Sequence, residues 1–376
     1  MNIEILIYMY ALLCLALIGF DCLWTLISYL KNKRIKKLEA EFCKKIEDQL
    51  KKIASGREIE KSHAKHLIKK LRNVDNLKAF HLALEKHKDN NAIEPYLPQL
   101  GKVFVLLAAE YEKQQSINKA YFGYVMSQYP NAFSETTKSI SEILISYLYD
   151  KSVYCRENAL QALYQLRNEE SIIRAVKILD NRKVYYNSKL LTDGLYSFKG
   201  SHEKLSVKLL DNFSLFHEPL QVAIINYLKL ININLSERLF GLLTDKNSND
   251  EIKFALIRYY GKHYYEPAKK VLIDYLLQNN GEEWESAALS ARALSNYKDR
   301  QVIDVLKTSL SSRNWYVRLN TASSLCEMKV SEEEFLDIIN GNDRFAREIL
   351  QYTFSIRKEN STEQKTRNQV GIEVCK

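Results

Sequence analysis

The chain of 376 residues is poor in the residues that interrupt helices, with only 5 prolines and 11 glycines. It also lacks any long alternation of apolar and polar residues, which is the pattern of a half-buried strand. Hydrophobic residues make up 46% of the chain, which is enough to build a large core. The scarcity of breakers and the missing strand pattern exclude a sheet protein and predict an all-α fold.

Motifs for catalysis and for metal binding are also missing. The chain contains no glycine-rich phosphate loop, no Gly-x-Ser-x-Gly and no His-Glu-x-x-His. His63 and His66 have a spacing that metals can use, but they lie among lysines without a suitably placed carboxylate, so we expect surface histidines. We therefore expect a protein that is not an enzyme, with no catalytic residues, no metal site and no cofactor.

The cysteines do not form a framework, because none of them belongs to a Cys-x-x-Cys pair or has histidine neighbours at metal spacing. We expect small free thiols rather than disulfides or a zinc site. The six positions are Cys14, Cys22, Cys43, Cys155, Cys326 and Cys375.

One long apolar run is present, from Ile5 to Leu30. As a helix rising ~1.5 Å per residue it would extend about 39 Å, enough to cross a ~30 Å hydrocarbon core. A cleaved signal peptide would have a basic start and a small-residue cleavage site, whereas this chain begins Met-Asn-Ile-Glu and has a large, basic flank. We predict that residues 1–30 form an uncleaved transmembrane anchor, with Asp21 either hydrated near the interface or in contact with another membrane helix.

Positive charge is concentrated directly after this run. The formal net charge of the chain is +9, and residues 31–90 alone contain 18 Lys or Arg and 9 Asp or Glu, whereas residues 91–376 are near neutral. This placement favours an anionic lipid surface as a partner and argues against nucleic acid. It also predicts a single-pass protein with its N-terminus outside and its body in the cytoplasm. The predicted membrane-surface residues are Lys31, Lys33, Arg34, Lys36 and Lys37.

The basic segment, residues 31–90, is predicted to form juxtamembrane helices. Apolar residues recur every three or four positions from Ile35 to Ile53, which is one stripe on a helix that ends at the natural break Gly56. The stripe is compatible with lying on the membrane, starting a short coiled coil or packing beneath the first repeat. Two further helices are expected at about 59–72 and 76–87.

A repeat follows. In each copy an apolar residue, which we call the opening residue, stands near the start of a predicted helix that is rich in small residues. These openings are separated by 31, 34, 32, 32 and 33 residues, and a Leu-rich helix and a short polar turn precede most of them. Such a period indicates stacked helical pairs. We expect the 24 tyrosines to fill space between helices with their hydroxyls in water. The opening residues are Cys155, Tyr186, Leu220, Ile252, Trp284 and Val317.

Two copies carry a family resemblance: residues 150–163, Asp-Lys-Ser-Val-Tyr-Cys-Arg-Glu-Asn-Ala-Leu-Gln-Ala-Leu, and residues 313–325, Arg-Asn-Trp-Tyr-Val-Arg-Leu-Asn-Thr-Ala-Ser-Ser-Leu. They resemble HEAT repeats, which are hard to separate from Armadillo-like units. The resemblance covers roughly residues 140–350, although the signature Pro and Asp of the turn are mostly missing. It implies an all-α fold, a right-handed α-solenoid of HEAT-like helical pairs with one N-terminal transmembrane helix.

With a further divergent unit at 93–130, the predicted solenoid covers residues 91–356. Its last helices are expected at about 332–339 and 343–356. The polar residues 357–376 are predicted to be a disordered tail.

Polar residues at the starts of two second helices suggest a partner-binding patch, because second helices usually carry the partner surface in such arrays. The alternative is a solvated face with cross-repeat ion pairs such as Arg156–Asp193. The candidate partner-binding residues are Arg156, Glu157, Asn158, Lys189 and Asp193.

These observations predict a membrane-tethered scaffold or accessory subunit that binds a protein partner. The chain is also similar to bacterial membrane-anchored HEAT proteins, and that resemblance implies a link to glycosyltransferase or polysaccharide-synthesis systems. Two alternatives stay open: a HEAT-like enzyme of the lyase or glycosylase type, and a trafficking adaptor whose stalk recognises anionic lipid.

Overall fold

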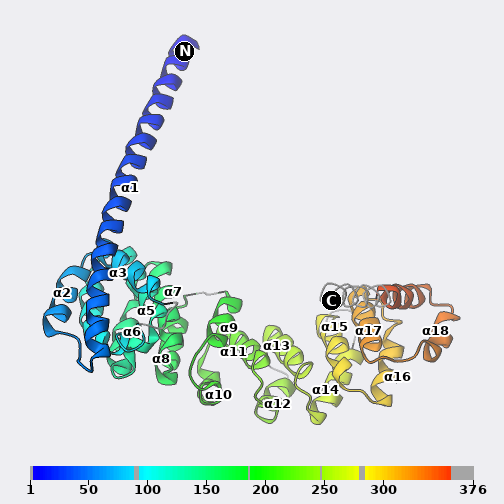
Figure 1. Cartoon of the computed structure of the whole chain (residues 1–376). Coiled ribbons are helices and arrows are strands. Elements are labelled where there is room, and N and C mark those ends of the chain that lie inside the picture. The colour runs from blue at the N-terminus through cyan, green and yellow to red at the C-terminus, as the bar shows by residue number, and fades with distance from the viewer. Residues whose placement is uncertain (1–2, 89–92, 185–186, 246–247, 279–283, 357–376) are drawn as a thin grey trace, which may run out of the picture. The chain divides into compact units, whose positions relative to one another are not determined.

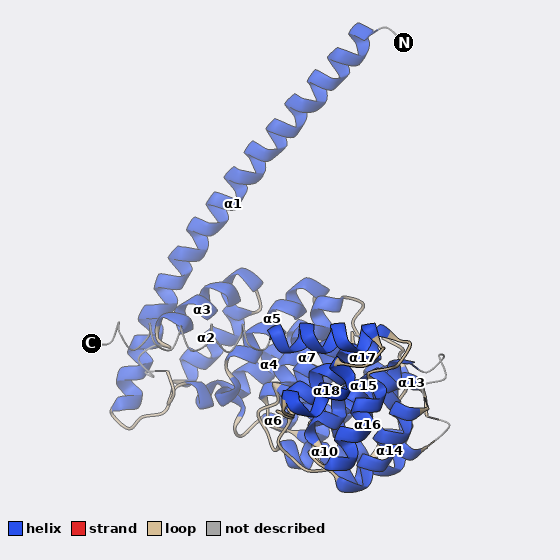
Figure 2. Cartoon of the chain, turned by 90° about the vertical axis from the view of Figure 1, so that its right-hand side faces the viewer, coloured by secondary structure: helices blue, strands red, loops and turns tan. Residues whose placement is uncertain are grey.

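The structure is a computed structural model, and it describes residues 3–88, 93–184, 187–245, 248–278 and 284–356. Throughout these residues the secondary structure is helical, with turns and loops between the helices (Figure 2). The prediction of an all-α fold is therefore confirmed. The predicted tail at 357–376 and the repeat-opening residue Tyr186 lie outside the described residues.

The longest helix is α1 (Ile3–Ala54), and the helices after it alternate as the first and second members of pairs (Figure 1). The first members are α2 (Lys61–Leu71), α4 (Gly101–Glu112), α6 (Thr137–Tyr147), α8 (Glu169–Asn181), α10 (His202–Asp211), α12 (Ser236–Thr244), α14 (Glu266–Leu277), α16 (Arg300–Ser309) and α18 (Leu336–Ile339). The second members are α3 (Val74–Lys86), α5 (Ser116–Gln128), α7 (Val153–Gln165), α9 (Ser188–Tyr196), α11 (Glu218–Leu230), α13 (Asp250–Tyr260), α15 (Trp284–Ala293), α17 (Trp315–Glu327) and a helix at 344–356. Short 3-10 helices lie between some of them: η1 (Leu97–Leu100), η2 (Pro130–Phe133), η3 (Phe213–Leu215), η4 (Leu294–Asn296) and η5 (Glu332–Phe335).

The chain forms two compact units. Unit 1 contains residues 1–182 and 197–201, and unit 2 contains residues 183–196 and 202–376. Helices α1 to α8 belong to unit 1, and the helices from α9 onward belong to unit 2. The predicted domain bounds stay a prediction.

Within each unit, like helices contact like helices of the next pair. In unit 1, α3 contacts α5 and α5 contacts α7, while α2 contacts α4, α4 contacts α6 and α6 contacts α8. In unit 2, second helices stack from α9 through α11, α13 and α15 to α17. The prediction of stacked helical pairs is confirmed, and the stacking already begins with α2 and α3.

The apolar run and the basic stripe, predicted as separate segments, form the single helix α1. Within the described residues, α1 is the helix long and apolar enough to cross a membrane, and its apolar stretch is exposed. From Ile35 onward one face packs on α3, and Ile35, Phe42 and Ile46 are almost fully buried. Of the three arrangements compatible with the stripe, packing against the first helical pair is the one observed.

The end of α1 follows from local chemistry at Gly56. This residue has φ of +79°, a left-handed conformation that glycine adopts without strain. The turn is closed by the amide of Gly56, which donates to the carbonyl of Ile53, and by that of Arg57, which donates to the carbonyl of Lys52. This pattern closes the helix and sends the chain back toward α2, as the sequence predicted.

Buried tyrosines join successive pairs. The hydroxyl of Tyr111 donates to the carbonyl of Leu71 at 2.7 Å, and that of Tyr147 donates to the carbonyl of Ala108 at 2.7 Å. Both side chains are 2% exposed or less. The expectation that tyrosine hydroxyls reach water is wrong here, because a buried hydroxyl needs a partner and the neighbouring pair supplies one.

If the stalk part of α1 belongs to the core of unit 1, Ile46→Ala will destabilise that unit. Ile46 is fully buried, so truncation should lower the free energy of unfolding by about 2–5 kcal/mol. Chemical denaturation of the full chain in detergent, followed by circular dichroism, measures the change. Leu17→Ala is the matched control, because Leu17 lies on the same helix and is 55% exposed. Equal unfolding curves for the two variants would contradict the account.

Candidate functional site

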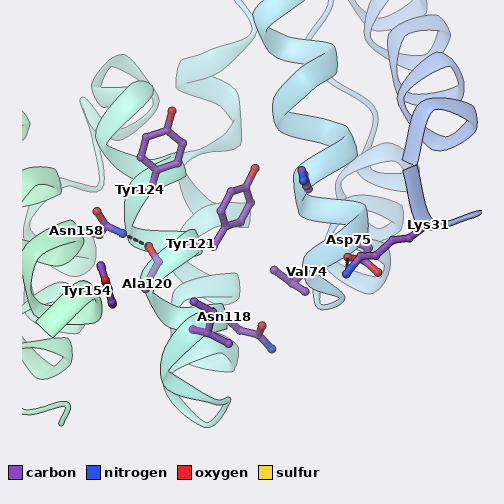
Figure 3. Close-up of a pocket in the computed structure, with 11 residues that line it drawn as sticks. Lys31, Val74, Asp75, Asn118, Ala120, Tyr121, Tyr124, Tyr154 and Asn158 are labelled. Carbon is purple, nitrogen blue, oxygen red and sulfur yellow. Dashed lines mark hydrogen bonds and ion pairs between the residues drawn. The ribbon is translucent and has the colours of Figure 1, made fainter. Parts of the chain in front are cut away.

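A groove lies in unit 1 where α1, α3, α5 and α7 meet, and it has a volume of about 470 Å³ (Figure 3). We call it the stalk groove. Its lining combines apolar, aromatic, amide and charged side chains from helices distant in the sequence. The lining residues are Lys31, Val74, Asp75, Lys78, Ile117, Asn118, Ala120, Tyr121, Tyr124, Tyr154 and Asn158.

Two ion pairs join α1 to α3, and the pair of Lys31 with Asp75 lies in the lining of the groove. The Nζ atom of Lys31 lies 2.9 Å from Oδ1 of Asp75, and Nζ of Lys86 lies 2.5 Å from Oε1 of Glu39. The two contacts advance in the same direction along both helices, so α3 runs parallel to α1. The start of α3 therefore lies beside the point where the apolar stretch of α1 ends.

An aromatic cluster supports the wall of the groove. The ring of His81 packs edge-on against Tyr121, Tyr124 and Tyr129, with centroid distances of 6.4, 5.6 and 5.6 Å. Nδ1 of His81 and the hydroxyl of Tyr129 lie 3.0 Å apart. Burial lowers the pKa of His81, opposed by the carboxylate of Glu85. The neutral imidazole thus fits a cluster in which His81 packs against Tyr121 and Tyr124, two of the three tyrosines that line the groove.

Close packing of α5 on α7 sets the floor. Nδ2 of Asn158 donates to the carbonyl oxygen of Ala120 at 2.9 Å (Figure 3). A Cβ atom at Gly123 would lie 3.2 Å from the carbonyl carbon of Asn158 and 3.3 Å from the amide nitrogen of Ala159. The small residues on this face let the two helices approach.

The five predicted partner-binding residues are distributed over both units. Arg156, Glu157 and Asn158 lie on α7 in unit 1, whereas Lys189 and Asp193 lie exposed on α9 in unit 2. Asn158 lines the stalk groove. Glu157 is half-buried, and that burial raises the pKa of its carboxyl group, partly offset by Arg156. A partner-binding role for the five residues stays a prediction.

The position of Arg156 has a structural explanation. Its side chain is 8% exposed, and Nη1 donates to the carbonyls of Asp150 at 2.8 Å and Lys151 at 2.9 Å. Arg318 makes the same contacts with the carbonyls of Ser312 and Arg313, and Arg347 contacts the carbonyl of Gly341. Each arginine is the fourth residue of a second helix and ties that helix to its preceding turn. The arginine that directly follows the opening residue at Cys155 and at Val317 therefore fixes the turn before its helix.

Of the predicted membrane-surface residues, Lys31 is the one that enters the stalk groove. Lys33, Arg34, Lys36 and Lys37 are exposed on α1. They lie beyond the groove lining but within two turns of it along the helix. Lipid contact by these residues stays a prediction.

The expectation of surface histidines is wrong for His63. This side chain is 6% exposed, and its Nε2 lies 2.7 Å from the hydroxyl of Tyr96. Burial lowers the pKa of His63 to about 4, with His66 adding to the effect. His66 is half-buried, and its Nε2 lies 2.8 Å from Nζ of Lys45. Lysines next to a histidine in the sequence do not show whether the histidine is buried. On a helix the lysines can point toward solvent while the histidine points toward the core.

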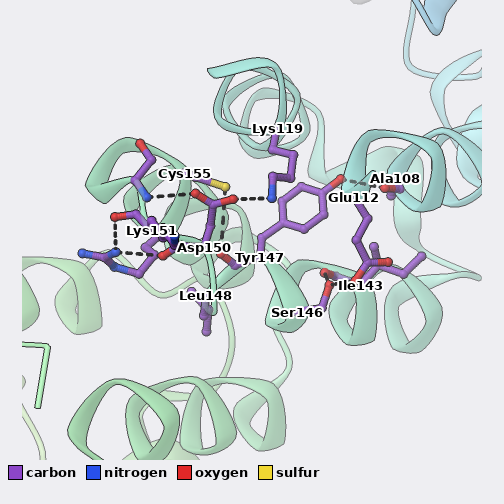
Figure 4. A network of polar contacts seen from close by, with 12 residues as sticks. Ala108, Glu112, Lys119, Ile143, Ser146, Tyr147, Leu148, Asp150, Lys151 and Cys155 are labelled. Carbon is purple, nitrogen blue, oxygen red and sulfur yellow. Dashed lines mark hydrogen bonds and ion pairs between the residues drawn. The ribbon is translucent and has the colours of Figure 1, made fainter. Parts of the chain in front are cut away.

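A polar network lies where α5 meets the turn before α7 (Figure 4). Asp150 pairs with Lys119 and accepts from the amide of Ser152 at 2.8 Å, as expected for an Asp that turns the chain into the second helix. Burial tends to raise the pKa of Asp150, but the hydrogen bonds from Lys119, Ser116 and Ser152 outweigh it, and the pKa is lowered. The network fixes the start of α7 relative to α5.

Sequence reasoning missed the groove tyrosines and Lys78. For one of them, Tyr154, the sequence did contain a signal. An aromatic residue stands at the second position of α7 and of α17, two residues before the arginine. Tyr154 and Tyr316 both occupy it, and they are 73% and 53% exposed. In unit 2, Tyr316 stacks on Trp284 at 5.1 Å and packs edge-on against Trp315 at 5.1 Å.

The described residues contain no group of three or more His, Cys, Asp or Glu arranged to hold a metal ion. No protein-family model matches the chain, and a search of curated proteins found no match.

The Asp150 network predicts a pH-dependent stability. Ionised Asp150 stabilises the fold above its unfolded-state pKa of about 3.9, and this contribution is lost as the pH falls through the lower folded-state value. Asp150→Asn should therefore be less stable than the wild type at pH 7, with the difference shrinking below about pH 3.

Denaturant titrations of the full chain from pH 7 down to about pH 2 measure this difference. Asp193→Asn serves as the control, because Asp193 is exposed and its substitution should change stability by less than about 0.5 kcal/mol. A constant gap between wild type and Asp150→Asn across the pH range would contradict the role given to the carboxylate.

Proposed function

We propose that this protein is a membrane-tethered, non-enzymatic scaffold or accessory subunit that holds a protein partner at the cytoplasmic face of a membrane. The observation that carries the proposal is the continuity of α1. Its exposed apolar stretch and its packed stalk are one helix, without a linker between them. A partner bound to unit 1 would thus be held at a defined position relative to the bilayer.

Charge and composition support the anchoring. The exposed apolar side chains of α1 run to Leu30, and the basic residues follow at once. Positive charge flanking a span favours the cytoplasmic side, so we propose a single-pass protein with its N-terminus outside. The exposed apolar surface would be costly to leave in water.

The stacked pairs support a binding role. We propose that they form a right-handed solenoid of HEAT-like, or Armadillo-like, pairs, as the resemblance at residues 150–163 and 313–325 implies. Arrays of this kind present second helices as an extended binding surface. Exposed aromatic side chains of the kind that anchor interfaces lie on α7 and α17, including Tyr154, Trp315 and Tyr316.

The partner system follows from the resemblance alone. Similarity to bacterial membrane-anchored HEAT proteins supports a partner from a glycosyltransferase or polysaccharide-synthesis system. In that setting the chain would position or regulate a synthase rather than transfer sugar.

The tether is tested by placing charges in the apolar part of α1. Leu17→Lys combined with Leu23→Lys should release the protein from membranes, because each lysine at a helix centre costs about 2.5–3.5 kcal/mol of insertion free energy. Alkaline extraction of membranes followed by immunoblotting measures the release. Leu106→Lys combined with Leu277→Lys is the control, since both leucines are similarly exposed but lie outside α1. Retention of the α1 variant in the membrane would contradict the tether.

The partner surface is tested by exchanging charges on α9. Lys189→Glu with Asp193→Lys keeps the net charge but inverts an exposed pair four residues apart, and like charges brought together at an interface cost several kcal/mol. We expect at least about a tenfold loss of the proteins crosslinked to the wild type in intact membranes, measured by quantitative mass spectrometry.

A matched control exists on α14, a first helix of the same unit. Lys270→Glu with Asp274→Lys inverts an exposed pair of the same residues at the same spacing. Partner recovery should stay at the wild-type level in this variant. Equal recovery from both charge-exchange variants would exclude the exposed face of α9 as the place of binding.

A further inference from the structure

The stalk groove has a composition and a position that the scaffold role does not use. We infer that it is a binding site for one anionic phospholipid, taken from the leaflet that surrounds the end of the α1 span. The inference rests on the proposed membrane tether. It goes beyond a general attraction between basic residues and lipid, because it assigns the lipid to a shaped site.

The level of the groove relative to the span is fixed by α1. From Ile7 to Leu30 most side chains of α1 are exposed and apolar, and Ile35 is the first to be buried against the body. Lys31, the first cation after the span, is also a lining residue of the groove. If α1 crosses the bilayer, the groove opens at the level of the lipid headgroups.

Parallel packing keeps the rest of the lining at the same level. The Lys31–Asp75 contact places the start of α3 beside the end of the span. Ile117 lies at the start of α5 and Tyr154 at the start of α7, and both line the groove. These two side chains are 65% and 73% exposed. Apolar and tyrosine side chains at this depth are typical of a membrane interface.

The net charge of the groove lining is opposite and equal to the charge of one phosphodiester. Lys31 and Lys78 contribute two positive charges, and Asp75 contributes one negative charge. Lys31 is already held by Asp75, whereas Lys78 is exposed and has no ion pair among the described contacts. The remaining single positive charge suits the single negative charge of a phosphatidylglycerol headgroup.

The uncharged lining suits the rest of such a lipid. Val74, Ile117 and the ring faces of Tyr121 and Tyr124 offer apolar surface to the glycerol backbone and the upper acyl chain. Asn158 uses its Nδ2 atom for the bond to Ala120, which leaves its carbonyl oxygen as an acceptor for a headgroup hydroxyl. The volume of about 470 Å³ lies within the range of small-ligand sites, roughly 300–1,000 Å³.

An acidic segment of a protein partner would meet the same two lysines. The largely apolar lining of the groove and its level at the end of the span favour a lipid. In a lipid the phosphate lies at the headgroup level and the hydrocarbon lies directly below it, toward the centre of the bilayer. The experiment therefore compares two lipids that differ in the headgroup alone.

Full-length protein in detergent micelles is titrated with dioleoylphosphatidylglycerol or dioleoylphosphatidylcholine, and retained lipid is counted by native mass spectrometry. The wild type should retain one phosphatidylglycerol molecule at least about tenfold more strongly than phosphatidylcholine. Lys78→Glu should remove this preference. Lys102→Glu makes the same charge change at an exposed position of α4 outside the groove lining, and it should keep the preference to within about twofold.

A wild type without preference for phosphatidylglycerol would overturn the inference, as would equal loss in the Lys78 and Lys102 variants, which would indicate diffuse attraction. If Lys78→Glu instead lost a crosslinked protein with lipid retention unchanged, the groove would belong to a protein partner. A failure of the proposed membrane tether can be told apart from a failure of the lipid site. Without a membrane tether the protein would stay in solution in the absence of detergent.

Discussion

The burial of one face of α1 against α3 is the contact on which the rest of the arrangement depends. Ile35, Phe42 and Ile46 remove apolar surface from water, and each fully buried side chain of this size contributes roughly 1.5–3 kcal/mol. The same helix then continues into an exposed apolar stretch without a break. In unit 1, α1 takes the place that a preceding second helix would have, so the helix proposed to cross the membrane also caps the stack.

From that contact the geometry of unit 1 follows. The ion pairs of Lys31 with Asp75 and of Lys86 with Glu39 fix α3 parallel to α1, and α5 and α7 stack after it. The turn before α7 is held by Arg156, whose guanidinium donates to the carbonyls of Asp150 and Lys151. The groove beside Lys31 is thus a consequence of how the stalk and three second helices are joined.

Much of the fold could be predicted because its signals are local. The spacing of residues such as Cys155, Leu220 and Val317 gave the repeat, and Gly56 gave the end of α1, since helix periodicity and a left-handed glycine depend on neighbours in the chain. Contacts between distant residues gave no such signal. His63, flanked by charge in the sequence, is buried against Tyr96, which lies 33 residues further along the chain. The groove was missed because Lys31, Lys78 and Tyr154 come from three helices whose register is set by packing.

The central claim is that the apolar part of α1 and unit 1 move as one body. Pulsed electron paramagnetic resonance in lipid nanodiscs tests it most directly, with spin labels introduced at Leu26→Cys on α1 and Lys151→Cys before α7, in a chain whose native cysteines are replaced. A single narrow distance distribution, unchanged between detergent and nanodiscs, is the result the account predicts. A broad or multi-peaked distribution would show a hinge between Leu30 and Ile35 and would contradict it.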